Sequence, residues 1–116
     1  SCGDEALKFT ADTLKEIAYD KGFAGRLGGD EFVIYMRNLN LYGDAGNYAK
    51  EIIDTLAAGY DSDISGSHLN VHCSIGIAFT HINGSTADDV IKASDAAMYE
   101  IKKHGKGDFA YAKNEE

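Results

Sequence analysis

The stretch that decides the fold is Arg26-Leu27-Gly28-Gly29-Asp30-Glu31-Phe32, where two glycines and two carboxylates separate two short apolar runs. Glycine tolerates the positive φ angles of tight turns, so these glycines predict a hairpin between strands at 23–27 and 31–37. Its bare tip would let a phosphate approach the backbone. Adjacent carboxylates supply the oxygen ligands that Mg²⁺ prefers when nucleotide phosphates also hold it. The alternative interpretation of the same residues is an exposed acidic turn.

The composition is that of one soluble domain, and we expect residues 1–116 to form it. The chain is 44% hydrophobic and 26% charged, as in ordinary globular proteins. A net charge of −8 leaves no basic stripe for nucleic acid, so a bound phosphate must be met locally by a metal and a few cations. There is no signal peptide and no apolar run long enough to span a membrane, which favours a cytoplasmic location without membrane insertion.

The cysteine content points to a reducing compartment. Cys2 and Cys73 are too few for a disulfide framework. Cys73 lies within an apolar alternation, so we expect it to be a buried thiol.

Hydrophobic periodicity predicts the order helix, strand, strand, helix, strand, helix, strand. Apolar residues recur at helical spacing in 4–20, 44–58 and 87–103, the last with Thr86 as its N-cap. Strict alternation predicts one long strand at 69–79, after a polar loop from Gly59 to Ser67, and 108–112 forms a short last strand. Both faces of 31–37 are apolar, so we expect that strand inside a sheet. The order indicates an α+β sandwich with helices covering a mixed sheet.

Four motifs in a fixed order carry a resemblance to a known family. They are Gly3-Asp4-Glu5-Ala6-Leu7, Gly28–Phe32, Ser74-Ile75-Gly76-Ile77-Ala78, and Ala93–Tyr99 followed by Lys102 and Gly105-Lys106-Gly107. On these motifs the chain resembles the GGDEF domain of diguanylate cyclases, which join two GTP molecules into cyclic di-GMP, a bacterial second messenger, and release pyrophosphate. The resemblance covers essentially the whole chain. It implies a palm-like, ferredoxin-like fold, Mg²⁺ or Mn²⁺ as cofactor, and a homodimer, because each domain binds one GTP.

The resemblance assigns the chemistry to the hairpin. Asp30 would ligate the metal and help to activate the attacking 3′-hydroxyl, with Glu31 beside it as a second catalytic carboxylate. Neighbours on a strand point to opposite faces, so the two need not share a role, and we assign the metal to Asp30 first. Gly28 and Gly29 would let the backbone approach the triphosphate.

The resemblance assigns the rest of the nucleotide to the helices. Asp4 would accept hydrogen bonds from the guanine edge, and Leu7 would line the base pocket. Lys102 and Lys106 would reach the phosphates. The family often has Arg at the position of Lys106. The bidentate hydrogen bonds of a guanidinium would then be replaced here by the single charge of an ammonium group. Lys102 also has a structural alternative, as a cation that suits the end of a helix.

The main departure from the family lies at the start of the chain. Members begin with a helix and a central strand that carries an Asp metal ligand and an Asn that contacts guanine, whereas this sequence opens just before the Gly3-Asp4 helix. We therefore expect the chain alone to be a weak or inactive cyclase, with the gap in the sheet filled by swapping or by another copy. A longer parent, with a flanking sensor domain or a membrane anchor, is the alternative and would be active.

Further departures concern regulation and rival functions. Many members bind their product at an Arg-x-x-Asp motif, where this chain has Tyr19-Asp20-Lys21-Gly22, so product inhibition by that route is not expected. The alternative function is an inactive GGDEF-like module that binds GTP or a partner domain. A third possible function is that of another palm-type nucleotidyl transferase or cyclase. The histidines lack zinc-site spacing.

Overall fold

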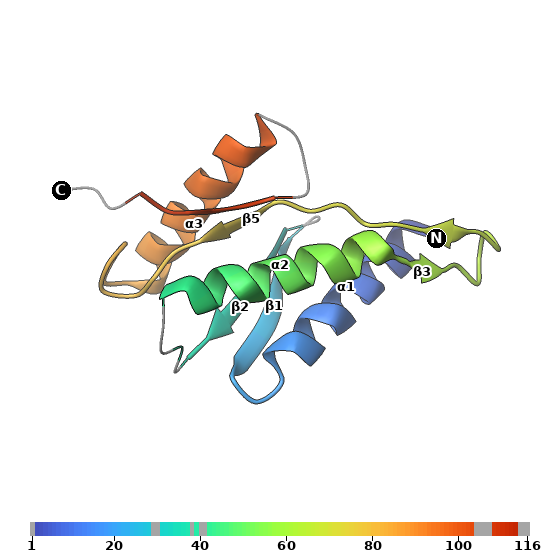
Figure 1. Cartoon of the computed structure of the whole chain (residues 1–116), viewed down its shortest axis with the longest axis horizontal. Coiled ribbons are helices and arrows are strands. Elements are labelled where there is room, and N and C mark those ends of the chain that lie inside the picture. The colour runs from blue at the N-terminus through green and yellow to red at the C-terminus, as the bar shows by residue number, and fades with distance from the viewer. Residues whose placement is uncertain (1, 29–30, 38, 40–41, 104–107, 114–116) are drawn as a thin grey trace.

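Three helices and six short strands make up the part of the chain that the computed structural model describes, residues 2–28, 31–37, 39, 42–103 and 108–113. The helices are α1 (Cys2–Ala18), α2 (Tyr42–Ala58) and α3 (Ala87–Lys102). The strands are β1 (Gly22–Gly28), β2 (Glu31–Met36), β3 (Tyr60–Asp61), β4 (His68–Leu69), β5 (Ile75–Ile77) and β6 (Phe109–Tyr111). The pairs β1–β2 and β3–β4 are antiparallel, and β5–β6 is parallel. The predicted α+β class is confirmed (Figure 1).

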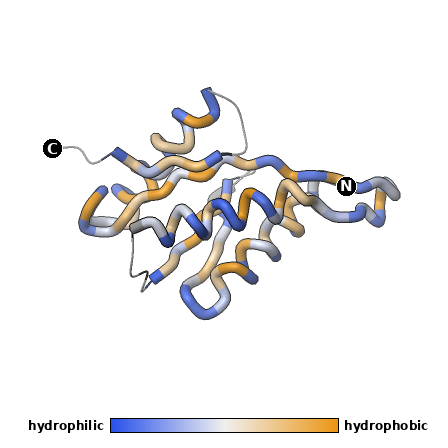
Figure 2. Tube along the Cα trace, in the orientation of Figure 1, coloured by the Kyte–Doolittle hydropathy of each residue, from blue (hydrophilic) through white to orange (hydrophobic). Residues whose placement is uncertain are grey.

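The core lies where α1 and α2 cover one face of the β1–β2 hairpin. Leu14 of α1 and Ile52 and Leu56 of α2 are its buried centre. Partly buried side chains from α1, from the β1–β2 hairpin and from residues 71–75 pack against them: Phe9, Ile17, Ala24, Phe32, Ile34, Val71, Cys73 and Ile75. Hydrophobic and hydrophilic residues alternate along α2 as expected for a helix with one face on a core (Figure 2). Cys73 is half-buried, and burial raises the pKa of its thiol to about 11.

A second unit is formed by β5, α3 and β6. A parallel pair needs a crossover connection, and α3 supplies it by packing on both strands. Thr86 caps the helix as predicted, since its hydroxyl accepts a hydrogen bond from the Asp89 N–H at 3.1 Å. β5 approaches α3 so closely that a Cβ on Gly76 would overlap the carbonyl oxygen of Ser94.

The prediction of one long strand at 69–79 is wrong. Only 68–69 and 75–77 are strands, because the residues between them bond to the end of α2 instead of to a neighbouring strand. The Val71 N–H donates to the Leu56 carbonyl at 2.9 Å, and the Asn70 side chain donates to the Ala57 carbonyl at 2.6 Å. The alternation reports burial correctly over 69–73, where Val71 packs on the core while His72 is exposed. From Ser74 to Phe79 both sets of residues are at least partly buried.

Two smaller expectations also need correction. The polar loop predicted at 59–67 contains β3, which pairs with β4 to form a hairpin at one end of the molecule (Figure 1). β2 was expected inside a sheet, but within the described residues it pairs with β1 alone. Apolar residues on both faces of a strand show that both faces make contacts. They do not show that both edges of the strand pair with neighbouring strands. On the face away from the helices, Tyr35 is 47% exposed and stacks on Phe23 at 5.5 Å.

The remaining boundaries shift by one or two residues from their predicted positions. The helices predicted at 4–20 and 44–58 begin two residues earlier, and the first ends at Ala18. None of the helices within the described residues combines the length and apolar character that crossing a membrane requires.

Candidate functional site

The tip of the β1–β2 hairpin begins at Gly28. Its φ of 154° is a conformation that residues with a side chain rarely adopt, and a Cβ built there would meet nothing within 4 Å. Glycine is therefore required for the turn and not for lack of space. The strand register shifts between Arg26 and Gly28, and such irregularities often accompany functional sites. Glu31, opposite Gly28, is exposed at the start of β2. Gly29 and Asp30 lie outside the described residues.

A cavity of about 350 Å³ lies between α1 and this hairpin. Leu7, Lys8, Ala11 and Lys15 line it from α1, and Ala24, Gly25, Arg26 and Phe32 line it from the strands. The structure thus places Leu7, the residue predicted for the base pocket, in the wall of a cavity beside the hairpin. Apolar side chains and three cationic ones line it together, which suits a flat ring that carries an anionic group.

Arg26 is a cavity residue that the sequence analysis missed. It pairs with Phe32 in the register, two residues along from the pair of Ala24 with Ile34. Because side chains alternate along a strand, Arg26 shares the face of residues that pack on the core. A cation on an otherwise apolar strand face, two residues before the glycines, was the signal that could have identified it.

Asp4 stands one turn before Leu7 on the same helix. It is exposed in the first turn of α1, where a carboxylate also suits the positive end of the helix dipole. The neighbouring Glu5 points to a different side of the helix and bonds to the β3–β4 hairpin. Leu7 thus lies beside the β1–β2 hairpin, and Asp4 precedes it by one turn on α1.

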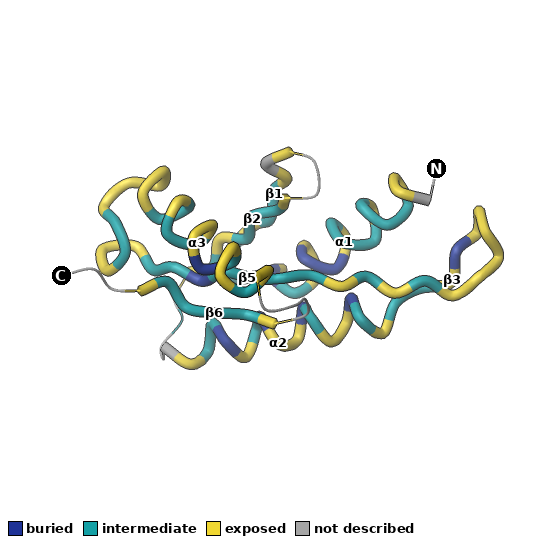
Figure 3. The backbone as a smooth tube through the Cα atoms, turned by 90° about the horizontal axis from the view of Figure 1, so that it is seen from above, coloured by how far each residue is buried: buried dark blue, intermediate teal, exposed yellow. Residues whose placement is uncertain are grey.

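Lys102 comes from the opposite side of the hairpin. It is exposed in the last turn of α3, which packs on β5 and β6. Figure 3 shows the β1–β2 hairpin between α3 and α1, so base-binding and phosphate-binding residues would approach it from opposite sides. Lys106 lies outside the described residues.

The carboxylates of the hairpin fit the chemistry of Mg²⁺. Glu31 is solvent-accessible at the turn, and carboxylate oxygens are the hard ligands that this ion prefers. Across the described residues, no group of three or more His, Cys, Asp or Glu side chains could hold a metal ion. The metal-binding role of Asp30 therefore stays a prediction.

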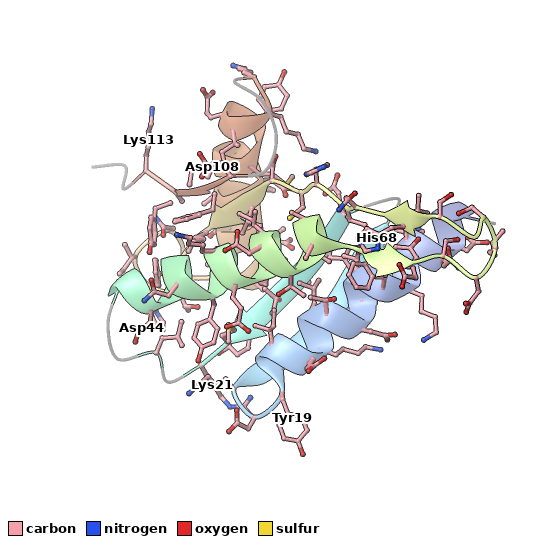
Figure 4. The ribbon with its side chains drawn as sticks, turned by 45° about the vertical axis from the view of Figure 1, so that its right-hand side comes forward. Tyr19, Lys21, Asp44, His68, Asp108 and Lys113 are labelled. Atoms are coloured by element: carbon pink, nitrogen blue, oxygen red, sulfur yellow. The ribbon has the colours of Figure 1, made fainter. Side chains whose placement is uncertain are left out.

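The positions that correspond to the product-binding motif lie at the turn after α1. Tyr19 and Lys21 project from this end of the molecule (Figure 4), and Tyr19 is 86% exposed. The Lys21 N–H donates to the Ala18 carbonyl at 2.8 Å and closes the turn. The sequence here does not supply the paired Arg and Asp of the motif.

The fold and the glycine hairpin define a palm-like α+β domain of the nucleotidyl-cyclase type. The family model described as "Diguanylate cyclase, GGDEF domain" matches residues 1–108, so the chain belongs to the GGDEF domain family. A curated relative, the Signaling protein YkoW of Bacillus subtilis (strain 168), is 36% identical over 110 residues. The match covers 94% of this chain but only 14% of that protein.

Solved structures agree with this assignment. The GGDEF domain of YfiN (TpbB) from Pseudomonas aeruginosa superposes with a TM-score of 0.87 at 28% identity, over 95% of this chain and 68% of that one. The active GGEEF domain of a diguanylate cyclase from Vibrio cholerae gives a TM-score of 0.78 at 26% identity, over 97% of this chain and 69% of that one. The expected family and fold are confirmed.

Proposed function

We propose that this chain is the GTP-binding and catalytic part of a diguanylate cyclase that condenses two GTP molecules into cyclic di-GMP and pyrophosphate. The observation that carries the proposal is the glycine hairpin beside the α1 cavity. Gly28 has a positive φ where the hairpin tip begins, and Leu7 and Phe32 line the cavity between α1 and the hairpin. The active Vibrio cholerae domain of the same fold supports the reaction class.

The base would occupy the α1 side of the hairpin. Asp4 would accept hydrogen bonds from the guanine edge, and Leu7 would contact the ring. Charged acceptors that pair with ring N–H groups discriminate strongly against bases that lack them. Arg26, in the cavity wall, is positioned to meet negative charge near the base.

The phosphates would lie over the hairpin tip. The bare backbone at Gly28 and Gly29 leaves room for them, and Lys102 and Lys106 would neutralise charge from the α3 side. Asp30 and Glu31 would hold Mg²⁺ or Mn²⁺, which supplies further charge neutralisation at the transferred phosphorus when bound. Attack by a 3′-hydroxyl then depends mainly on in-line placement, with Asp30 accepting its proton.

The product requires two active sites that face each other, so the active form is a homodimer of this domain. Each copy would present one GTP, and each 3′-hydroxyl would attack the α-phosphorus of the other nucleotide. GTP supply places the reaction in the cytoplasm, where a longer parent protein would bring two copies together.

A second candidate is a GTP-binding or regulatory module without turnover. The resemblance places another metal ligand and a guanine contact on a strand beside the hairpin. β2 has no such neighbour within the described residues. That observation favours weak or absent activity for this chain on its own.

Turnover of GTP with Mg²⁺, followed by chromatography and mass spectrometry, tests the proposal. We expect cyclic di-GMP from the wild-type chain or from a longer form, and a loss of at least about 100-fold in Asp30→Ala because a metal-binding carboxylate is removed. Asp54→Ala, an exposed carboxylate on α2, is the matched control and should retain activity. GTP binding without product in either form would support the second candidate.

A further inference from the structure

The first turn of α1 is tied to the β3–β4 hairpin through Glu5. Its carboxylate accepts hydrogen bonds from the hydroxyls of Tyr60 at 3.2 Å and Ser62 at 2.6 Å, and from the Asp63 N–H at 3.1 Å. These donors are 55 to 58 residues away in sequence. The contact joins the start of the chain's first helix to an element after α2.

Ser62 organises the turn that receives Glu5. It is only 4% exposed, and its hydroxyl oxygen accepts from the N–H groups of Ile64 at 3.2 Å and Ser65 at 3.0 Å. A hydroxyl has one proton to donate, and here that proton goes to Glu5. The Ser62 hydrogen bond, with those of Tyr60 and the backbone, lowers the pKa of Glu5. The carboxylate is therefore the ionised acceptor at neutral pH.

An apolar contact supports the same junction one turn further along α1. Phe9 lies four residues after Glu5 and hence on the same helix face. Its ring packs against Tyr60 with a centroid distance of 4.7 Å. Helix ends fray because their first N–H groups lack helical partners, so two successive turns held by one hairpin are a specific restraint.

We propose that Glu5 is a positioning residue that fixes the first turn of α1 and thereby places Asp4 for recognition of the guanine edge. The inference rests on the proposed function. Asp4 is the adjacent residue, rotated by about 100° around the helix, so it projects from a different side of α1 than Glu5. A displacement of the first turn would move the Asp4 carboxylate by a similar distance, and charged hydrogen bonds weaken steeply with misalignment.

Base discrimination is the readout that separates positioning from a structural role. Inosine triphosphate lacks the exocyclic amino group of guanine and is otherwise the same ligand as GTP. We expect the wild-type chain to bind GTP about tenfold more tightly than inosine triphosphate. In Asp4→Asn this ratio should fall close to one, and in Glu5→Ala it should fall by about fivefold, measured by calorimetry well below the melting temperature of each variant.

Two further variants complete the experiment. Glu5→Gln keeps the side-chain shape and should lower the ratio less than Glu5→Ala. Glu16→Gln removes a charge from an exposed position three turns along the same helix and should leave the ratio unchanged. Hydrogen exchange at the amides of the first α1 turn should rise in Glu5→Ala and stay unchanged in Glu16→Gln.

The outcomes distinguish this inference from the proposed function. A wild-type ratio in Glu5→Ala, with the ratio lost in Asp4→Asn, would overturn the positioning role and leave guanine recognition intact. A lowered melting temperature with an unchanged ratio would do the same and assign Glu5 a structural role. No preference for GTP in the wild-type chain would overturn both.

Discussion

His68 is a single residue whose two ring nitrogens both meet acceptors. Nδ1 lies 2.8 Å from an oxygen of Asp61, and Nε2 lies 2.7 Å from the Ala58 carbonyl oxygen. Both nitrogens carry a proton only in the imidazolium form, so this arrangement favours the charged ring. Figure 4 shows His68 beside the end of α2. The bond to Asp61, followed by the bond to Ala58, raises the pKa of His68 above 6.5.

The raised pKa of His68 predicts a pH-dependent stability. A group whose folded pKa is raised stabilises the fold fully below its unfolded pKa of 6.5 and loses that contribution as the pH rises through the folded pKa. We expect the melting temperature of the wild-type chain to fall, relative to His68→Gln, as the pH rises above 6.5 and through the raised pKa. His72→Gln, at an exposed histidine, is the control and should follow the wild-type curve. Parallel curves for wild type and His68→Gln would contradict the prediction.

At the residue scale, the positive φ of Gly28 could be predicted from the pair of glycines between two strands. The ligand-binding roles of Gly28 and Leu7 stay predictions. The contact of Glu5 with Ser62 could not be predicted, because it joins residues 57 apart and no local pattern encodes such a pairing. Arg26 stands out in the sequence as a cation in an apolar strand. Its place in the cavity, opposite Phe32, follows only from the pairing of the two strands.

Among the elements, the junction of β5 and α3 depends on one glycine. A methyl group on Gly76 would overlap the Ser94 carbonyl and lie 2.9 Å from the Met98 nitrogen, and backbone atoms cannot rotate away as side chains do. We expect Gly76→Ala to lower the free energy of unfolding by about 2 kcal/mol, measured by urea denaturation. Gly43→Ala is the matched control, since a Cβ there meets nothing within 4 Å and alanine favours a helix. Equal stability of the two variants would contradict the close packing.

Elements were predicted in type more reliably than in length. The three helices and the hairpin were each predicted from periodicity and turn residues, and their ends moved by about two residues. The strand at 69–79 failed because alternation records which side chains are buried, whereas a strand also needs a partner along its edge. Val71 and Asn70 bond to the end of α2, a choice that depends on tertiary structure.

At the scale of the whole molecule, one small core joins the layers. Leu56 is 1% exposed and is the largest fully buried side chain within the described residues. We expect Leu56→Ala to cost about 3 kcal/mol of unfolding free energy, from lost burial plus the cavity that remains. Ile82→Ala, at a side chain that is 53% exposed, should change it by less than about 0.5 kcal/mol. A loss below about 1 kcal/mol in Leu56→Ala would show that the core lies elsewhere.

The molecule is elongated, with principal extents of 50 × 33 × 23 Å. The α+β class could be predicted from the order of elements, since helices that alternate with strands must cover a sheet. The division of the described strands into three two-stranded sheets could not, because it depends on which strand edges find partners in three dimensions. The β3–β4 hairpin lengthens the molecule at the end where α1 begins (Figure 1).

The stacked pair of Phe23 and Tyr35 has a consequence for the behaviour of the protein in solution. The two rings are 61% and 47% exposed on a surface that carries a net charge of −8. Charge repulsion between two copies keeps such exposed aromatic patches apart. Dissolved ions screen this repulsion, which decays over about 8 Å at physiological ionic strength. The ionic strength of the buffer therefore changes how readily two molecules meet through this face.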